Sequence, residues 1–185
     1  LLPSGRLREW RYGHNRAQVV IVTKCQKNPD VIEEQFWRKN LNLKSNQHLF
    51  FSTIQYAIPY NIFNSNERFV LNSNAHIFLI SAIAQSNYLS EYLLPLVGSL
   101  TEYTFEDHHY FNEEELQKII DRYLAVDNYN KWIITTEKDA TRLVLFKELL
   151  YKHKISVFAL PIEVNFFKKE EFNQLMKNYL LDYKS

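Results

Sequence analysis

The sequence predicts an α/β fold of three layers, with helices on both faces of a mostly parallel sheet and a short β-hairpin arm. Segments rich in β-branched and aromatic residues alternate with segments of helical periodicity along most of the chain. Helix-capping and helix-breaking residues stand between them. Strands separated by helices imply right-handed crossovers, and therefore parallel strands within one sheet.

The first elements form a strand–helix–strand unit. The run AQVVIVTKC at 17–25 is β-branched and continuous, which is typical of a strand covered on both faces. Pro29 and Asp30 suit the first turn of a helix that extends to about Asn40. The stretch HLFFSTIQY at 48–56 predicts a second strand.

Residues 57–74 interrupt this alternation. Pro59 and several asparagines surround a short apolar run, a pattern that favours an exposed hairpin or linker arm. We therefore expect three parts, namely an opening segment at 1–16, an α/β domain formed by 17–56 and 75–185, and an arm at 57–74.

The alternation resumes after the arm. The run HIFLISAIA at 76–84 predicts a strand, and 88–97 predicts a helix that Gly98 would end. The alternating stretch at 100–106 predicts a strand near a sheet edge.

Asn112 and Glu115 have the spacing of a capping box for a helix from 113 to about 125. We expect the remaining strands at 131–136 and 155–162, and the remaining helices at 139–153 and 168–182.

Composition excludes several classes of function. The net charge is +1, so no overall electrostatic field favours nucleic acid as a partner. Only three glycines occur, which rules out the common glycine-rich phosphate loops within this sequence. The single cysteine, Cys25, excludes an internal disulfide and a cysteine-based zinc site.

Polar residues follow the predicted strands at their carboxyl ends, where open parallel sheets bind ligands. They are Thr23-Lys24, Ala84-Gln85, Asp107-His108-His109 and the stretch from Thr135 to Asp139. Such a rim is suited to an anion, but strand ends also turn through polar loops in proteins without a site there.

The segment TTEKDATRL at 135–143 carries one candidate site. Thr136 can cap the following helix, whose first N–H groups favour negative charge. Lys138 adds a mobile cation, while Glu137 and Asp139 add carboxylates. The alternative is an ordinary capped helix start with solvated charges, and the residues alone favour that alternative.

The cluster FEDHH at 105–109 allows three interpretations. A metal site requires converging ligands, whereas adjacent histidines diverge unless the loop kinks. An acid–base site requires one histidine oriented by a carboxylate, which Glu106 or Asp107 could supply. The third interpretation is a polar turn, which the residues alone favour.

The opening segment interleaves arginines, among them Arg6 and Arg8, with Trp10 and Tyr12. Such a mixture can bind phosphate or lie against anionic lipid headgroups. It can equally be a solvated segment whose arginine stems cover apolar surface.

The motifs LLPSGRLRE, VVIVTK, AIAQ, FEDHHYF, IITTEKDATRL and VFALPIEVNF, in this order, resemble the tetraacyldisaccharide 4′-kinase family of lipid A biosynthesis. The family pattern is approximately LLPxGxLRE, a strand, IAxP, FxDHHxF, TTEKDxxRL or TTEKDxxKL, and a closing ALPIE-like strand. The resemblance covers Leu1 to about Phe167. Trp10 and Ser86 stand where the family pattern has proline.

The resemblance implies a cytoplasmic kinase, peripheral to the inner membrane of a Gram-negative bacterium. It would transfer the γ-phosphate of ATP to the 4′-hydroxyl of a tetraacyldisaccharide 1-phosphate, with magnesium. ATP and Mg²⁺ are then expected to bind mainly through an N-terminal half that precedes this chain. The start at Leu1, the single methionine Met176 and the few glycines fit a C-terminal portion. We expect the isolated chain to fold without phosphorylating.

The resemblance also implies roles for residues. A histidine of Asp107-His108-His109 would pair with an aspartate of the missing half and tune it as a base. The sequence leaves open which histidine acts, with a slight preference for His108. No metal ligand and no protein partner are assigned to the chain. The residues expected to line a cleft for substrate or nucleotide are Arg6, Arg8, Thr136, Glu137, Lys138 and Asp139.

The alternative to an enzyme is a binding protein, namely a non-catalytic α/β module that binds a nucleotide or an acidic partner. The sequence before Leu1 distinguishes the two, because a glycine-rich loop with lysine and serine or threonine there favours the kinase.

Overall fold

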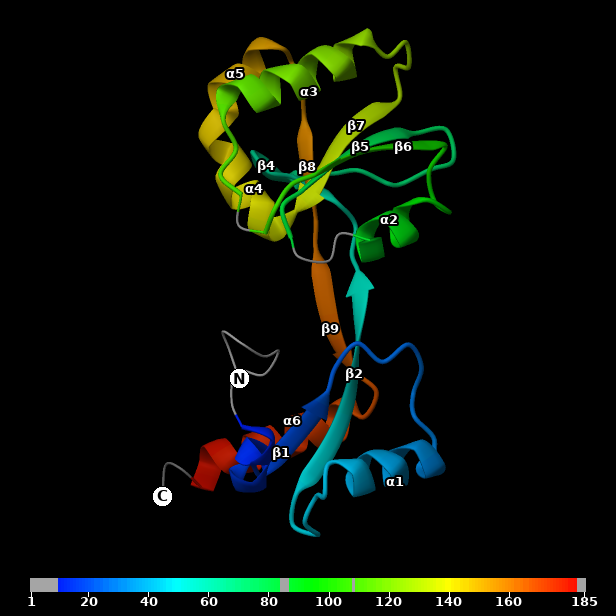
Figure 1. The fold of residues 1–185 in the computed structure, drawn as a ribbon, viewed down its shortest axis with the longest axis vertical. Coiled ribbons are helices and arrows are strands. Elements are labelled where there is room, and N and C mark those ends of the chain that lie inside the picture. The colour runs from blue at the N-terminus through cyan, green and yellow to red at the C-terminus, as the bar shows by residue number, and fades with distance from the viewer. Residues whose placement is uncertain (1–9, 84–86, 108, 183–185) are drawn as a thin grey trace. The chain divides into compact units, whose positions relative to one another are not determined.

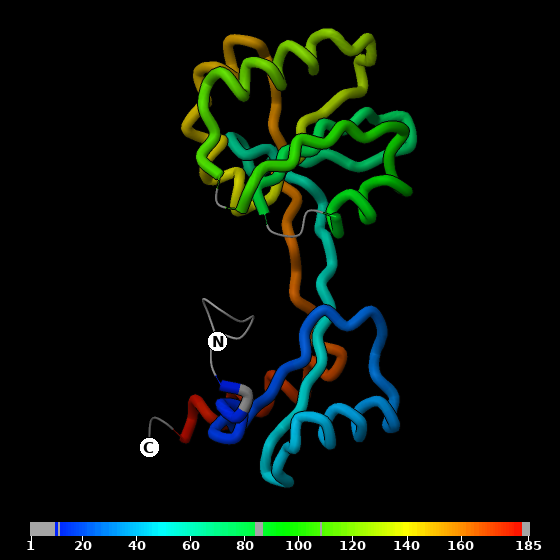
Figure 2. The backbone as a smooth tube through the Cα atoms, viewed as in Figure 1, coloured from blue at the N-terminus to red at the C-terminus, as the bar shows by residue number. Residues whose placement is uncertain are grey.

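The structure is a computed structural model that describes residues 10–83, 87–107 and 109–182. The chain divides into two compact units (Figure 1). Unit 1 combines Leu1–Gln55 with Ile162–Ser185, and unit 2 is the continuous segment Tyr56–Pro161. The colours of Figure 2 show this division, since blue and red ends of the chain build unit 1 while the middle of the chain builds unit 2.

Unit 1 contains a three-stranded sheet in the order β1-β2-β9. Strand β1 (Val19–Val22) is parallel to β2 (His48–Tyr56), with Val19 opposite His48. Three aromatic rings pack together in this unit, because Phe166 stacks on Phe172 at 4.0 Å and both lie edge-on to Phe50. The other elements of unit 1 are β9 (Ile162–Phe166), η1 (Arg11–Arg16), α1 (Val31–Asn40) and α6 (Lys169–Asp182).

Helix α1 ends at Asn40, as the sequence predicts, and begins at Val31, directly after the two residues expected in its first turn. Asp30 is its N-cap, and the Asp30 carboxylate accepts the backbone N–H of Glu33 at 2.8 Å. The Glu33 carboxylate in turn accepts the backbone N–H of Asp30 at 3.1 Å, which completes a capping box. The cap satisfies two N–H groups that a helix start otherwise leaves without partners.

Unit 2 contains a six-stranded sheet in the order β4-β3-β8-β7-β5-β6. Strands β8, β7, β5 and β6 are parallel, while β3 is antiparallel to both β8 and β4. The predicted α/β class with a mostly parallel sheet is therefore confirmed. The strands are β3 (Tyr60–Asn61), β4 (Asn64–Arg68), β5 (His76–Ser81), β6 (Ser99–Thr104), β7 (Lys131–Thr136) and β8 (Val157–Leu160).

Helices cover both faces of this sheet. Side chains alternate along β5, so that Phe78 and Ile80 join one buried cluster while Ile77 and Leu79 join the other. The first cluster receives residues of α3 (Glu113–Ala125), α4 (Glu137–Leu143) and α5 (Lys147–Lys152), with η2 (Val144–Phe146) between α4 and α5. The second cluster receives residues of α2 (Asn87–Leu93). In the part of the chain that the structure describes, no helix has both the length and the apolar character needed to cross a membrane.

The structure divides the chain into two units, whereas the sequence predicts one α/β domain with an opening segment and an arm. The strand predicted at 155–162 is two strands, β8 and β9, in different sheets. They separate at Pro161, which has no backbone N–H to donate to a ladder. The arm predicted at 57–74 lies within unit 2, where β3 extends the sheet through the pairing of Tyr60 with Ala159.

Two predicted helices have different bounds. Helix α2 ends at Leu93, so Gly98 does not terminate it but directly precedes β6. Gly98 does not have a positive φ; instead, a Cβ placed there would lie 2.5 Å from the carbonyl oxygen of Ser73. Glycine is therefore required by a close backbone approach. In place of the single helix predicted at 139–153, the structure has three consecutive elements, α4, η2 and α5.

Candidate functional site

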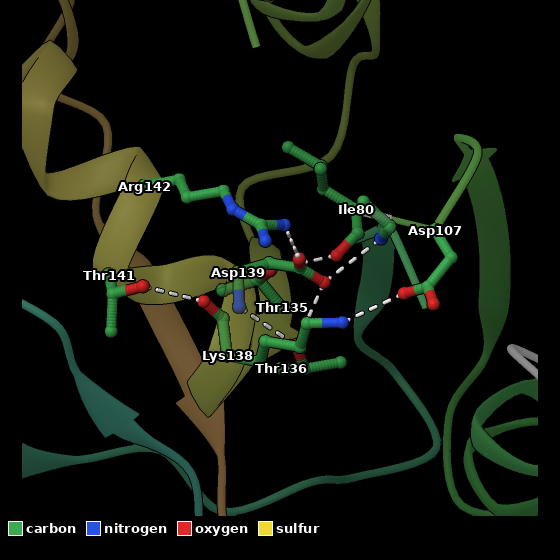
Figure 3. A network of polar contacts seen from close by, with 9 residues as sticks. Ile80, Asp107, Thr135, Thr136, Lys138, Asp139, Thr141 and Arg142 are labelled. Atoms are coloured by element: carbon green, nitrogen blue, oxygen red, sulfur yellow. Dashed lines mark hydrogen bonds and ion pairs between the residues drawn. The ribbon is translucent and has the colours of Figure 1, made fainter. Parts of the chain in front are cut away.

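The candidate site lies in unit 2, at the carboxyl ends of β5, β6 and β7 (Figure 3). Because these strands are parallel, the residues that follow them meet at one edge of the sheet. We call the residues that meet there the rim cluster: Ala82, Asp107, Thr136, Lys138, Asp139 and Arg142. The cluster joins the loop after β6 to the start of α4.

Asp139 is the buried centre of the rim cluster, with no exposed surface. Its Oδ2 accepts hydrogen bonds from the backbone N–H of Ala82 at 2.9 Å and from Thr136 Oγ1 at 2.8 Å. Its Oδ1 accepts from Arg142 Nη1 at 3.1 Å (Figure 3). Both carboxylate oxygens are thus engaged by the protein itself, so Asp139 positions the rim and is not open to a ligand.

Thr136 has the capping role that the sequence predicts. Its Oγ1 accepts the backbone N–H of Asp139 at 3.0 Å, as expected of an N-cap residue. Thr135, one residue earlier, is buried, and its hydroxyl donates to the Ile80 carbonyl at 2.8 Å. These bonds fix the end of β7 against β5.

Asp107 and Lys138 form an ion pair across the rim. Lys138 Nζ lies 2.8 Å from Asp107 Oδ1, and both side chains are 41% exposed. The pair therefore contacts solvent on its outer side, unlike Asp139. Water screens such a pair, so it contributes little to stability and its charges are accessible to an incoming anion or hydroxyl group.

Glu137 points to a different contact. Its Oε1 accepts a hydrogen bond from the phenol of Tyr60 on β3 at 3.2 Å. Burial, together with the nearby charge and hydrogen bond of Glu137, raises the pKa of Tyr60. The four predicted residues from Thr136 to Asp139 thus have three separate roles: a cap, a positioning carboxylate and two exposed charges with different partners.

His109 is held by aromatic residues of its loop and by Glu115 of α3. Its Nε2 lies 2.9 Å from Glu115 Oε2, and its ring stacks on Phe105 at 4.7 Å between ring centres. The ring of Phe111 meets His109 edge-on at 5.6 Å. These contacts fix the loop between β6 and α3, which also carries Asp107.

The capping box of α3 is part of the same arrangement. Asn112 accepts the Glu115 N–H at 2.9 Å, and Glu115 Oε2 accepts the Asn112 N–H at 3.1 Å, as the sequence predicts. The hydrogen bond with His109 lowers the pKa of Glu115; partial burial opposes this and the Asn112 N–H adds to it. Glu115 therefore remains an ionised acceptor for His109 at neutral pH.

The other residues predicted for the rim lie outside the described part of the chain or follow a strand of another sheet. Arg6, Arg8 and His108 lie outside the described residues, as do Ala84 and Gln85. Thr23 and Lys24 follow β1, which belongs to the separate sheet of unit 1. The predicted rim was wrong in assigning them to the same sheet as Asp107, because β1 and β2 form a sheet of their own with β9.

The potential metal-ligating side chains of the described residues do not gather at one place. Across 10–83, 87–107 and 109–182, no three His, Cys, Asp or Glu side chains gather where they could hold a metal ion. The carboxylate of Asp139 is fully engaged, and that of Asp107 is paired with Lys138.

Sequence reasoning missed two members of the rim cluster. Arg142 follows Asp139 by three residues, a spacing that allows an ion pair on one helix face and could have indicated it. The backbone N–H of Ala82 carried no such signal, because it is 57 residues from its acceptor.

Comparison with known proteins places the chain in a family. Residues 1–181 match the sequence profile of LpxK, tetraacyldisaccharide-1-P 4′-kinase. The chain belongs to this family. Tetraacyldisaccharide 4′-kinases of Bacteroides thetaiotaomicron and Bacteroides fragilis are 36% and 37% identical to it, each over 97% of the chain. That of Flavobacterium johnsoniae is 34% identical over 92% of the chain.

The chain spans about half the length of the curated LpxK relatives it matches, 50% of both Bacteroides proteins and 47% of the Flavobacterium protein. The solved structure of LpxK from Aquifex aeolicus in complex with ATP has the same fold, with a TM-score of 0.55 at 17% identity. The similarity covers 96% of this chain and 47% of the Aquifex chain. The predicted family resemblance is therefore confirmed.

Proposed function

We propose that this chain is part of an ATP-dependent tetraacyldisaccharide 4′-kinase. The enzyme would transfer the γ-phosphoryl group of ATP to the 4′-hydroxyl of a tetraacyldisaccharide 1-phosphate, a lipid A precursor. The bond from the γ-phosphorus to the bridging oxygen of ADP breaks, a phosphate ester forms, and the hydroxyl proton leaves. The observation that carries this proposal is the match to the LpxK family over residues 1–181.

Phosphoryl transfer needs cations around the moving group and a group that orients or deprotonates the attacking hydroxyl. The rim cluster supports such a role, since Lys138 offers an accessible cation and Asp107 an accessible carboxylate. Arg6 and Arg8, which the resemblance assigns to the same task, would approach the substrate phosphate or the nucleotide. ATP and Mg²⁺ would bind mainly through the part of the enzyme outside this chain, where magnesium would offset charge on the phosphates.

We assign different roles to the two histidines. His109 is engaged by Glu115 and by two aromatic rings, so its role is to hold the loop after β6. His108, its neighbour in the Asp-His-His motif, is then the candidate that pairs with a carboxylate from the rest of the enzyme and handles the proton. The resemblance also supports action at the cytoplasmic surface of the inner membrane, where the acylated substrate resides.

The test is a kinase assay on the complete protein encoded by the gene, with labelled ATP and the tetraacyldisaccharide 1-phosphate. We expect His108→Ala to lower turnover by about 100-fold or more, the usual contribution of a proton-transfer group, without changing the free energy of unfolding. His109→Ala is the matched control and should lower the stability, because it removes the contacts to Glu115 and Phe105.

Wild-type turnover in His108→Ala would refute the assigned role. A complete protein that folds but does not phosphorylate this lipid would refute the proposed reaction. We also expect the 185-residue chain alone to be inactive, and ATP-dependent turnover by that chain would contradict the assignment of nucleotide binding to another part of the enzyme.

A further inference from the structure

The edge of the unit 2 sheet that carries the rim cluster continues into the hairpin of β3 and β4. The strand registers place Ile80, Thr135 and Ala159 side by side on β5, β7 and β8. The same row continues through Tyr60 on β3 to Arg68 on β4. Two successive antiparallel pairings make β4 run in the direction of β8, and Arg68 is the last residue of β4. Arg68 therefore stands at the carboxyl end of its strand, on the edge where open sheets bind ligands.

Buried neighbours fix the direction of the Arg68 side chain. Phe69 is buried and packs in the cluster on the α2 side of the sheet. Successive side chains of an extended chain point to opposite faces, so Arg68 points to the side of α4. Asn61 is also buried, and its Nδ2 donates to Glu67 Oε2 at 2.7 Å, which joins β3 to β4. Arg68 is therefore presented by a hairpin whose two strands are tied together.

The guanidinium of Arg68 is held in place but keeps donors for a ligand. Its Cζ lies 5.4 Å from the centre of the Tyr60 ring, and its Nη1 donates to the Ile58 carbonyl at 3.4 Å. The Tyr60 hydroxyl in turn donates to Glu137 Oε1 at 3.2 Å, which fixes the ring. The Arg68 side chain is exposed. A guanidinium has five N–H donors, and its planar fork binds phosphate through two parallel hydrogen bonds.

Arg68 is well separated from the ion pair of Asp107 and Lys138 at the other part of the rim. Three strand spacings lie between β4 and β7, the strand that Lys138 follows. Neighbouring strands are about 4.8 Å apart, so the two backbones are separated by about 14 Å. The phosphates of one nucleotide are linked through single bridging oxygens and lie closer together than this. In a tetraacyldisaccharide 1-phosphate, two sugar rings separate the 4′-hydroxyl from the phosphate, so the separation suits the two ends of that disaccharide.

We propose that Arg68, held against the ring of Tyr60, binds the 1-phosphate of the acceptor lipid while the 4′-hydroxyl lies at Asp107 and Lys138. The inference rests on the proposed function and adds to it a residue that determines acceptor specificity. Tyr60 and Glu137 are positioning residues in this arrangement, because they act through the guanidinium. The 1-phosphate does not react, so Arg68 binds it equally in the ground state and the transition state. Such an interaction lowers KM without changing kcat.

The test compares two acceptors, the tetraacyldisaccharide 1-phosphate and the same lipid without its phosphate, in the kinase assay on the complete protein. Arg68→Ala should lower kcat/KM for the 1-phosphate about 10-fold or more, because charge-assisted hydrogen bonds to the phosphate are lost. We expect this change in KM and not in kcat, and no change for the lipid without phosphate. Arg68→Lys should retain part of the preference, because it keeps the charge but loses the planar fork.

Arg122→Ala is the matched control, since Arg122 is an exposed arginine of unit 2 in the last turn of α3. It should leave the KM of both acceptors unchanged. Equal losses for the two acceptors in Arg68→Ala, or unchanged values for both, would overturn the inference. So would a raised KM for ATP with the preference between acceptors retained, because Arg68 would then bind a phosphate of the nucleotide.

Binding measured without ATP separates this inference from the proposed reaction. Calorimetric titration of the complete protein with each lipid in detergent micelles gives the Kd. Arg68→Ala should weaken binding of the 1-phosphate about 10-fold or more and leave binding of the other lipid unchanged. Wild-type protein that binds the two lipids equally would overturn the inference even if it phosphorylates both. Loss of affinity in Arg68→Ala, in a protein whose wild type shows no turnover, would refute the proposed reaction alone.

Discussion

Asp139 is a charged residue without solvent contact, so its role depends entirely on its partners. The backbone of Ala82, the hydroxyl of Thr136 and the guanidinium of Arg142 together occupy both carboxylate oxygens. The side chain of Arg142 is itself only 17% exposed. Asp139 thus connects the end of β5 with the start of α4, whereas the exposed pair of Asp107 and Lys138 leaves charge at the surface.

We expect Asp139→Asn to lower the free energy of unfolding by about 2 kcal/mol, because it removes the carboxylate charge opposite Arg142 and one acceptor of a buried hydrogen-bond network. Urea denaturation of the 185-residue chain measures this change. Thr141→Ala is the control on the same helix, since its exposed hydroxyl donates to the Lys138 carbonyl at 2.7 Å, and it should change stability by less than about 0.5 kcal/mol. Similar values for the two variants would show that Asp139 does not hold the rim.

The connection between α2 and β6 packs closely against another part of the backbone. This connection passes so close to residues 73–75 that the Gly98 N–H donates to the Ala75 carbonyl at 2.9 Å. A side chain at position 98 would meet the Ser73 carbonyl oxygen, which belongs to the backbone and has little freedom to move. The start of β6, and with it the path of the strand toward Asp107, depends on this contact.

Gly98→Ala should therefore destabilise the protein by about 2 kcal/mol, the usual cost of forcing an extra carbon into a closely packed position. The alanine also restricts the unfolded chain, which favours folding by less than about 1 kcal/mol, so a net loss is expected. Chemical denaturation compares it with Ser99→Ala at the exposed neighbouring position, where little change is expected. Equal stability of the two variants would contradict the close approach.

The two units differ in whether one continuous segment or two separate segments of the chain build them. Unit 2 is one continuous segment and contains all members of both large buried clusters. Unit 1 is assembled from two separate segments, and its described buried hydrophobic residues come from a single strand. Unit 2 therefore has an interior of its own, while unit 1 depends on contacts between distant parts of the sequence.

We expect the excised segment 56–161 to fold by itself and to unfold in a single cooperative transition. Near-UV circular dichroism and urea denaturation measure this, because fixed aromatic packing and cooperativity are lost together in a two-state protein. Leu79→Ala, in the interior of that segment, should lower its stability by about 2–5 kcal/mol. Retained secondary structure without a cooperative transition would contradict an independent unit 2.

The sequence by itself determined the elements whose signals are local. The capping box at Asn112 and the cap at Thr136 were predicted and are confirmed, because a cap depends on residues three or four positions apart. The order of the motifs likewise predicted the family, and the match over residues 1–181 confirms it. The roles of Asp107, His108 and His109 stay predictions.

Only the tertiary structure decided which strands share a sheet and which polar groups are buried. The division at Pro161, the burial of Asp139 and the pairing of Asp107 with Lys138 depend on segments far apart in the chain. The ion pair between Lys168 and Glu34 of α1 likewise joins residues 134 positions apart. A local pattern specifies a helix or strand, but the partners that it meets are set by how the whole chain packs.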